Sequence, residues 1–152
     1  MSGEQRVDSA AIIAEAKSWI GTPYLHQASV KGAGTDCLGL LRGLWRALFG
    51  PEPEVVPPYT EDWAEPDHRE VLMMAADRLL VAKPVSDAAP ADILLFRMRD
   101  DGIAKHLGIQ TEIGGSAGFI HAYTGHGVIE SPLSLPWARR IAARYSFPTG
   151  AR

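Results

Sequence analysis

The chain has 152 residues, of which 15 are lysine or arginine and 18 are aspartate or glutamate, so its formal net charge is −3. Hydrophobic residues make up 46% and charged residues 22%, which is typical of a folded globular protein and excludes disorder as the main state. The length suits one domain. The slightly negative charge gives no indication of nucleic-acid binding. A single cysteine excludes an internal disulfide and a cysteine-rich zinc site.

The N-terminal region does not resemble a signal peptide. Residues 1–10 contain no apolar core, and Glu15 and Lys17 interrupt the stretch that follows. No apolar run approaches the roughly 20 residues that a membrane span requires. We therefore expect a protein that is made in the cytoplasm, has no membrane contact, and needs another carrier if it acts outside the cell.

Apolar residues recur at helical spacing near the start of the chain. The spacing predicts a first helix over residues 8–20, capped by Asp8 or Ser9 and stopped by Gly21. The polar, glycine-containing residues 22–35 that follow are predicted to form a loop.

A second helix is predicted to begin at Asp36 or Cys37 and to end at Gly50, which a proline follows directly. Five prolines in residues 51–66 exclude a regular helix or a central strand there, so this segment reads as an insert. A third helix is predicted over residues 67–80.

From Ala91 the pattern changes to short apolar runs separated by turns, which is typical of strands. The predicted strands are Ile93–Phe96, His106–Thr111, Phe119–Tyr123, Gly127–Glu130 and Ile141–Phe147. Helices that come first and strands that come later indicate an α+β fold with an antiparallel sheet. We expect residues 1–152 to form a single domain that carries the insert.

Cys37 is expected in the first turn of the second helix. Helix N-termini carry partial positive charge and unpaired N–H groups, which favour a thiolate and can stabilise an oxyanion. A lone cysteine on an apolar helix face is more commonly a small buried hydrophobic residue. The position alone therefore leaves both interpretations open.

Two histidines, His106 and His121, lie 121 − 106 = 15 residues apart on either side of a glycine-rich turn. Antiparallel pairing about Gly114 would bring them nearly opposite each other. If both face the helix that carries Cys37, the three side chains provide a nucleophile, a base and a group that orients the base. Two half-buried, hydrogen-bonded structural histidines fit the pattern equally well.

Five ordered sequence blocks resemble the NlpC-type cell-wall peptidases, which are papain-like cysteine peptidases. The blocks are GTPY (residues 21–24), TDCLGL (35–40), ADILLF (91–96), HLGIQ (106–110) and FIHAY (119–123). Each block is weak alone, but the ordered set is specific. The Pro-rich insert and the helix after it resemble the branch of this family that is found in phage tails and gene transfer agents.

The resemblance implies roles for five residues. Cys37 would be the nucleophile, His106 the general base, and His121 the group that orients His106. Asp36 matches a position that can meet a substrate amine. Tyr24 matches a tyrosine beside the nucleophile that can contact the substrate or the oxyanion. The resemblance implies no metal and no organic cofactor.

The implied fold is a papain-like α+β domain with N-terminal helices packed on an antiparallel sheet. The implied reaction is hydrolysis of a peptide bond in peptidoglycan stem peptides, often between D-glutamate and diaminopimelate, through a thioester on Cys37. Together with the missing signal peptide, this predicts a protein carried in a phage-like tail, bound to hub or baseplate proteins, that acts in the periplasm and cell wall.

Departures from the family pattern leave the substrate and reaction open. Leu38 replaces a serine that usually follows the nucleophile, and residues 25–27 (Leu-His-Gln) stand where glycines are common. An amidase or acyl transferase that uses the same cysteine is therefore an alternative. Another alternative is a structural tail-hub component with weak or no activity, in which Trp63 and the insert would bind partners.

The remaining residues of chemical interest give weaker indications. His26 and His126 could line the rim of the site, and His68 is expected in solvent. The segment Pro132–Arg140, which contains Trp137, is either a docking surface or a folded edge. A mononuclear zinc site is disfavoured because its candidate ligands lack the short spacings of known zinc motifs. Those candidates are Cys37, His106, His121 and His126.

Overall fold

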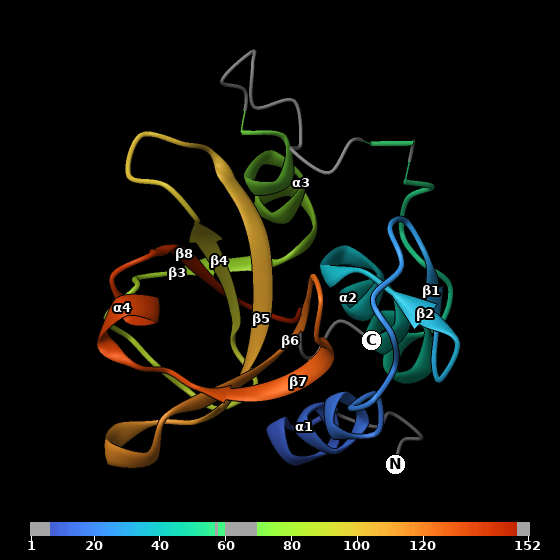
Figure 1. Ribbon diagram of the computed structural model, residues 1–152, viewed down its shortest axis with the longest axis horizontal. Helices are drawn as coiled ribbons and strands as arrows, with labels where there is room; N and C mark the ends of the chain where they lie inside the picture. Colours follow the sequence, from blue (N-terminus) through green and yellow to red (C-terminus); the bar gives the residue numbers. More distant parts are fainter. Residues whose placement is uncertain (1–6, 57, 60–69, 149–152) are drawn as a thin grey trace.

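The structure is a computed structural model that describes residues 7–56, 58–59 and 70–148 (Figure 1). Helices occupy the first half of the described chain and the main strands occupy the second half. The α+β class that the sequence predicts is confirmed.

Helix α1 covers Ser9–Lys17, so it ends earlier than residue 20, where the apolar pattern places its end. Its start is as predicted, because a side-chain oxygen of Asp8 accepts a hydrogen bond from the backbone N–H of Ala11 at 2.9 Å. From Trp19 on, the backbone hydrogen bonds span three residues instead of four, which tightens the chain into a turn.

Helix α2 covers Cys37–Phe49, and its predicted bounds are confirmed. Gly50 ends the helix with a φ of 103°, a conformation that glycine adopts without strain. Helix α3 covers Val71–Leu79. Residues 67–69 of the predicted third helix lie outside the described residues, and the backbone of Glu70 is not helical. The described helix therefore begins later than the apolar pattern indicates.

The five predicted strands are all present. They are β4 (Ile93–Arg97), β5 (Ala104–Glu112), β6 (Gly118–Tyr123), β7 (Gly127–Pro132) and β8 (Ile141–Ser146). A short 3₁₀ helix, Gly114–Ser116, joins β5 to β6.

Four short elements were not expected from the sequence. Strand β3 (Val81–Lys83) pairs with β8. Strands β1 (Ser29–Val30) and β2 (Gly34–Thr35) form a hairpin inside the predicted loop. Helix α4 (Leu135–Ala138) lies between β7 and β8. All four are too short to produce a recognisable hydrophobic period.

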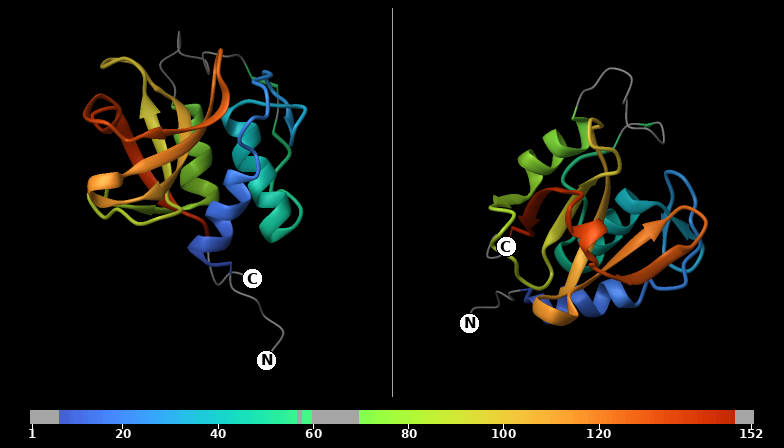
Figure 2. Two further views of the ribbon diagram at one scale, coloured as in Figure 1. Left: turned by 60° about the horizontal axis from the view of Figure 1, so that its bottom comes forward. Right: turned by 60° about the vertical axis from the view of Figure 1, so that its left-hand side comes forward.

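In the described part of the chain, six strands form one antiparallel sheet in the order β3-β8-β4-β5-β6-β7. Helices α1, α2 and α3 pack against this sheet, and Figure 2 shows α4 away from α1 and α2, beside the strands. Among the described residues, no helix is long and apolar enough to cross a membrane.

The sheet has two apolar faces because side chains alternate along each strand. Leu95, Leu107 and Ile120 belong to the main core, which the helices cover. Phe96 and Phe119 form a second cluster on the opposite face, together with Trp137 of α4. Cys37 belongs to the main core, whereas His106 and His121 pack against Phe96 and Phe119 of the second cluster.

Candidate active site

Cys37 is the first residue of α2, and its side chain is 6% exposed. Burial, followed by the negative charge of Asp36, raises the pKa of the Cys37 thiol to about 12. The backbone N–H groups of Leu107, Leu38 and Cys37 itself act in the opposite direction and favour the thiolate. The resting side chain is therefore a neutral thiol that has N–H donors around it.

Strands β5 and β6 open beside this thiol. Their paired residues run from Glu112 and Gly118 to Ile109 and Ile120. Beyond that point β5 continues to Ala104 paired with β4. The N–H of Leu107 lies in this part of β5, where it meets the thiol. Helix α2 contacts both strands.

A cavity of about 160 Å³ lies at this opening. Residues that line it include Tyr24, Asp36 and Cys37 near the start of α2, His106 of β5, and Tyr59 of the insert. A larger and mostly apolar cavity of about 340 Å³ lies between α2, α3 and residues 52–59, but neither Cys37 nor His106 lines it. The reactive groups therefore meet in the smaller cavity.

His106 and His121 are hydrogen-bonded to each other. Nε2 of His106 lies 2.8 Å from Nδ1 of His121, and the two side chains are 8% and 0% exposed. Because Nε2 of His106 is used in this bond, Nδ1 is the nitrogen that remains to take a proton from the thiol. The structure brings Cys37 and His106 to one cavity and puts His121 directly behind His106.

The histidine pair lies on the sheet face opposite the main core, to which Cys37 belongs. The two histidines share the sheet face of Phe96 and Phe119, opposite the main helices, with ring distances of 5.8 Å and 4.3 Å. Cys37 and His106 nevertheless line the same cavity. The structure thus differs from the arrangement considered in the sequence, in which both histidines face the helix that carries Cys37.

Aromatic side chains keep both imidazoles in a dry environment. The Trp137 ring lies 5.8 Å from that of His106 and 5.2 Å from that of His121, so this part of segment 132–140 packs over the site. Burial, followed by the charge of His121, lowers the pKa of His106 to about 3. Burial, followed by the charge of His126, lowers the pKa of His121 to about 4. Both imidazoles are therefore neutral at pH 7.

Gly108 provides the room that this arrangement requires, and sequence analysis did not single it out. A Cβ at this position would lie 2.7 Å from Cδ2 of Phe119 and 3.4 Å from Cβ of His121. The glycine two residues after His106 therefore leaves room on β5 for the side chains of Phe119 and His121, which come from the neighbouring strand β6. The block HLGIQ contained this signal.

Asp36 is 2% exposed, and both of its carboxylate oxygens accept hydrogen bonds. Oδ1 accepts from the N–H of Gly39 at 2.7 Å, which caps α2. Oδ2 accepts from the N–H of Gln27 at 2.7 Å and from the hydroxyl of Tyr59. Asp36 thus joins the start of α2 to the hairpin region and the insert. Its role toward a substrate amine stays a prediction.

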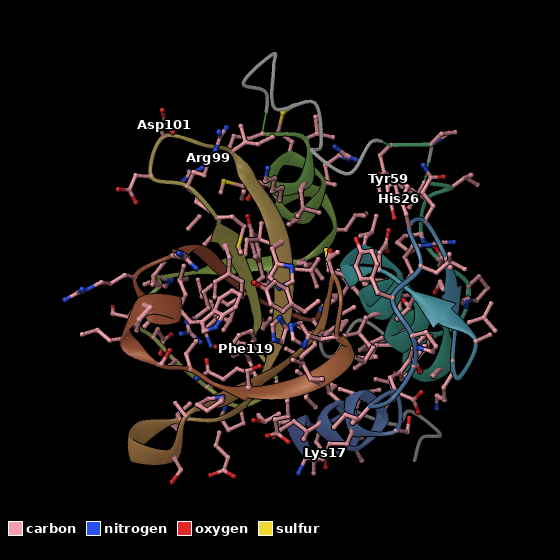
Figure 3. All side chains as sticks on the ribbon, in the orientation of Figure 1. Lys17, His26, Tyr59, Arg99, Asp101 and Phe119 are labelled. Atoms are coloured by element: carbon pink, nitrogen blue, oxygen red, sulfur yellow. The ribbon has the colours of Figure 1, made fainter. Side chains whose placement is uncertain are left out.

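Tyr59 is a second residue that sequence analysis missed. Its carbonyl accepts hydrogen bonds from the side chain of Gln27 at 2.6 Å and lies 2.9 Å from Nε2 of His26. Figure 3 shows the Tyr59 and His26 side chains next to each other, and their rings lie 5.2 Å apart. Nothing in the Pro-rich sequence marks which of its aromatic residues returns to Asp36.

The other expected residues divide into three groups. Tyr24 and His26 line the cavity. His126 stacks on Tyr123 at 5.3 Å instead. Trp63 and His68 lie outside the described residues. Within residues 7–56, 58–59 and 70–148, no cluster of three or more histidine, cysteine or acidic side chains could hold a metal ion.

No protein-family model matches the chain, and no curated protein matches it. Among solved structures, the chain is similar to the NlpC/p60 domain of the peptidoglycan hydrolase SagA. The TM-score is 0.62 and the identity 23%, over 93% of this chain and 100% of that chain.

Two further solved structures support the same fold. One is an NlpC/P60 family protein from Bacillus cereus ATCC 10987, with a TM-score of 0.65 and 18% identity over 94% of this chain and 41% of that one. The other is NlpC1 from Trichomonas vaginalis, with a TM-score of 0.60 and 20% identity over 97% of this chain and 46% of that one. The chain therefore has the NlpC/p60 fold, and it spans less than half of these two proteins.

Proposed function

We propose that this protein is a cysteine peptidase that hydrolyses peptide bonds in peptidoglycan stem peptides. The observation that carries the proposal is the single cavity lined by Cys37 and His106, with His121 bound 2.8 Å behind His106. The NlpC/p60 fold and the peptidoglycan hydrolase SagA among its structural neighbours support the substrate class.

The first step is attack by Cys37 on the amide carbonyl. Nδ1 of His106 takes the thiol proton, and the sulfur forms a bond to the carbonyl carbon. Burial disfavours each charge separately, but the transfer creates a thiolate and an imidazolium side by side, where each stabilises the other. Burial of both groups therefore favours proton transfer in concert with substrate binding.

The start of α2 supplies donors for the oxyanion that forms on the carbonyl oxygen. The N–H groups of Gly39 and Leu40 are used in the cap, by the side chain and the carbonyl of Asp36. The N–H groups of Cys37 and Leu38 lie at the thiol and are available to the attacked carbonyl. They are backbone groups, so the change from serine to Leu38 does not remove them.

The second half of the reaction returns the proton. His106 donates its Nδ1 proton to the leaving amine, and the carbon–nitrogen bond breaks to give a thioester on Cys37. Water then attacks the thioester with His106 as base, which releases the carboxylate product and restores the thiol. His121 holds the ring of His106 through both transfers.

The bond that we propose is the one between D-glutamate and diaminopimelate. The test uses a soluble muropeptide that contains this bond, with mass spectrometry of the products from the wild-type protein, Cys37→Ala and His106→Ala. We expect a fragment with a new amino terminus on diaminopimelate from the wild-type protein alone. Loss of the whole stem peptide would indicate an amidase, and a new amide would indicate acyl transfer. No product from a folded wild-type protein would contradict the proposal.

We also propose that the protein is delivered as part of a phage-like tail. The support is the resemblance of the Pro-rich insert and the helix after it to the phage-tail and gene-transfer-agent branch of the peptidases. The test is protein mass spectrometry of purified particles from cells that encode the chain. Its presence in tail or baseplate fractions is expected, and its absence from particles would contradict this part of the proposal.

A further inference from the structure

The histidine pair continues to a third polar side chain, Ser131 of β7. Nε2 of His121 lies 2.9 Å from Oγ of Ser131, and Nδ1 of the same ring lies 2.8 Å from Nε2 of His106. Ser131 of β7 pairs with Phe119 of β6, so it lies on the strand next to the one that carries His121. A chain of hydrogen bonds therefore runs from the base, through His121, to a hydroxyl.

The proton positions along this chain are coupled because a neutral imidazole carries one N–H and one acceptor nitrogen. In one arrangement, His106 donates from Nε2, His121 donates from Nε2 to Ser131, and Nδ1 of His106 is an acceptor. In the other, His121 donates from Nδ1 to His106, whose own proton then sits on Nδ1. The second arrangement prevents His106 from taking the thiol proton.

Once His106 is protonated, only the first of these two arrangements is possible. When His106 carries a proton on both nitrogens, its Nε2–H must donate to Nδ1 of His121. The proton of His121 is then on Nε2, and the hydroxyl oxygen of Ser131 accepts it. We propose that Ser131 is a positioning residue that stabilises the base-competent tautomer of His106 by accepting the Nε2–H of His121. This inference rests on the proposed function.

Burial makes the acceptor necessary. His121 is 0% exposed, and the rings of Phe119, Tyr123 and Trp137 lie 4.3, 5.3 and 5.2 Å from its ring. These rings cover His121 on the sides away from Ser131, which is itself half-buried. Without Ser131, the base-competent arrangement leaves a buried N–H without a partner, and the cost falls on the state that forms when the thiol proton is transferred.

The test compares Ser131→Ala with Ser131→Thr, which keeps the hydroxyl. We expect Ser131→Ala to lower kcat roughly tenfold with little change in KM, because one hydrogen bond to the protonated histidine pair is lost. Ser131→Thr is expected to retain most of kcat. The second readout is the ¹⁵N chemical shifts of the His106 and His121 ring nitrogens, which report the tautomer. We expect these shifts to change in Ser131→Ala and to return in Ser131→Thr.

The two readouts separate this inference from the proposed function. Wild-type shifts in a folded Ser131→Ala variant would overturn the inference, and so would equal loss of kcat in both variants, since that would indicate packing instead of the hydroxyl. If the wild-type protein cleaves no peptidoglycan peptide, the proposed function fails. The ring-nitrogen shifts still decide then whether Ser131 sets the tautomer.

Discussion

The hydroxyl of Tyr59 donates a hydrogen bond to Oδ2 of Asp36, which lies 23 residues earlier in the chain. Asp36 directly precedes Cys37 and caps the helix that carries it. Through this contact, Tyr59 of the insert reaches the start of the same helix and lines the cavity. Tyr59 is thus part of the candidate site.

Tyr59→Phe removes this hydrogen bond while keeping the ring. We expect a loss of about 1 kcal/mol in the free energy of unfolding. The negative charge of Asp36 raises the pKa of the Cys37 thiol. Without the Tyr59 hydroxyl, this charge is less well compensated, so the pKa of the thiol should rise further. The measurement is the rate of thiol alkylation by iodoacetamide at pH 8. A fall of roughly threefold is expected, which corresponds to a pKa rise of about half a unit.

Tyr145→Phe is the matched control for this change. The hydroxyl of Tyr145 donates to Asp77 at 2.7 Å, on α3 and outside the cavity of Cys37. The same loss of stability is expected there, with wild-type alkylation. An equal effect of both variants on alkylation would show that Tyr59 acts through general stability alone.

Gly108→Ala tests the space between the histidine strands. The added Cβ would lie 2.7 Å from Cδ2 of Phe119, so Phe119 or β5 must move, and the His106–His121 contact moves with them. We expect a destabilisation of about 1–3 kcal/mol and a loss of activity of tenfold or more. Thermal unfolding and the muropeptide assay measure the two effects. Gly115→Ala is the control, because nothing lies within 4 Å of a Cβ at that position. Wild-type activity in folded Gly108→Ala would contradict the account.

The buried histidines make stability depend on pH. The pKa values of His106 and His121 are lowered to about 3 and about 4, whereas histidines in the unfolded chain titrate near the ordinary value of about 6.5. The unfolded chain therefore binds more protons between these values, and stability falls as pH falls below about 6.5. Each histidine contributes up to about 1.4 kcal/mol per pH unit, and its full contribution is present above that range.

His121→Gln isolates this effect. Urea unfolding of the wild-type protein and of the variant at several pH values from 7 to 5 gives the two slopes of stability against pH. The slope of the variant is expected to be smaller by up to about 1.4 kcal/mol per pH unit. Identical slopes would show that His121 is protonated as easily in the folded protein as in the unfolded chain.

His121→Ala tests the separation between orienting the base and being the nucleophile. The substitution removes the ring that bonds to Nε2 of His106, so His106 loses the hydrogen bond that orients it. We expect the rate of hydrolysis to fall roughly 100-fold or more. The thiol of Cys37 should still react with iodoacetamide at high pH, because the nucleophile is intact. Hydrolysis at the wild-type rate would remove His121 from the catalytic group.

Local signals predicted the elements that place the site. The cap at Asp36 and the stop at Gly50 define α2, and the apolar runs define β4 to β6, because these strands are buried on both faces. The edge strand β3 was not predictable, since its side chains are mostly exposed and its pairing with β8 joins distant parts of the chain.

The candidate site shows the same division. The grouping of Cys37, His106 and His121 was predicted from the resemblance of their blocks to a known family, because the histidine pattern alone fitted a structural pair equally well. Tyr59 and Trp137 reach the site from distant segments through hydrogen bonds or ring contacts. Such contacts depend on tertiary packing and leave no local pattern in the chain.

The measurement that tests the central claim most directly is digestion of purified peptidoglycan sacculi by the wild-type protein and by Cys37→Ala, with mass spectrometry of the soluble products. Both proteins are first shown to have the same fold by circular dichroism. We predict new peptide termini from the wild-type protein and none from Cys37→Ala. Equal release of the same fragments by both proteins would contradict the account, because hydrolysis would then proceed without the thiol.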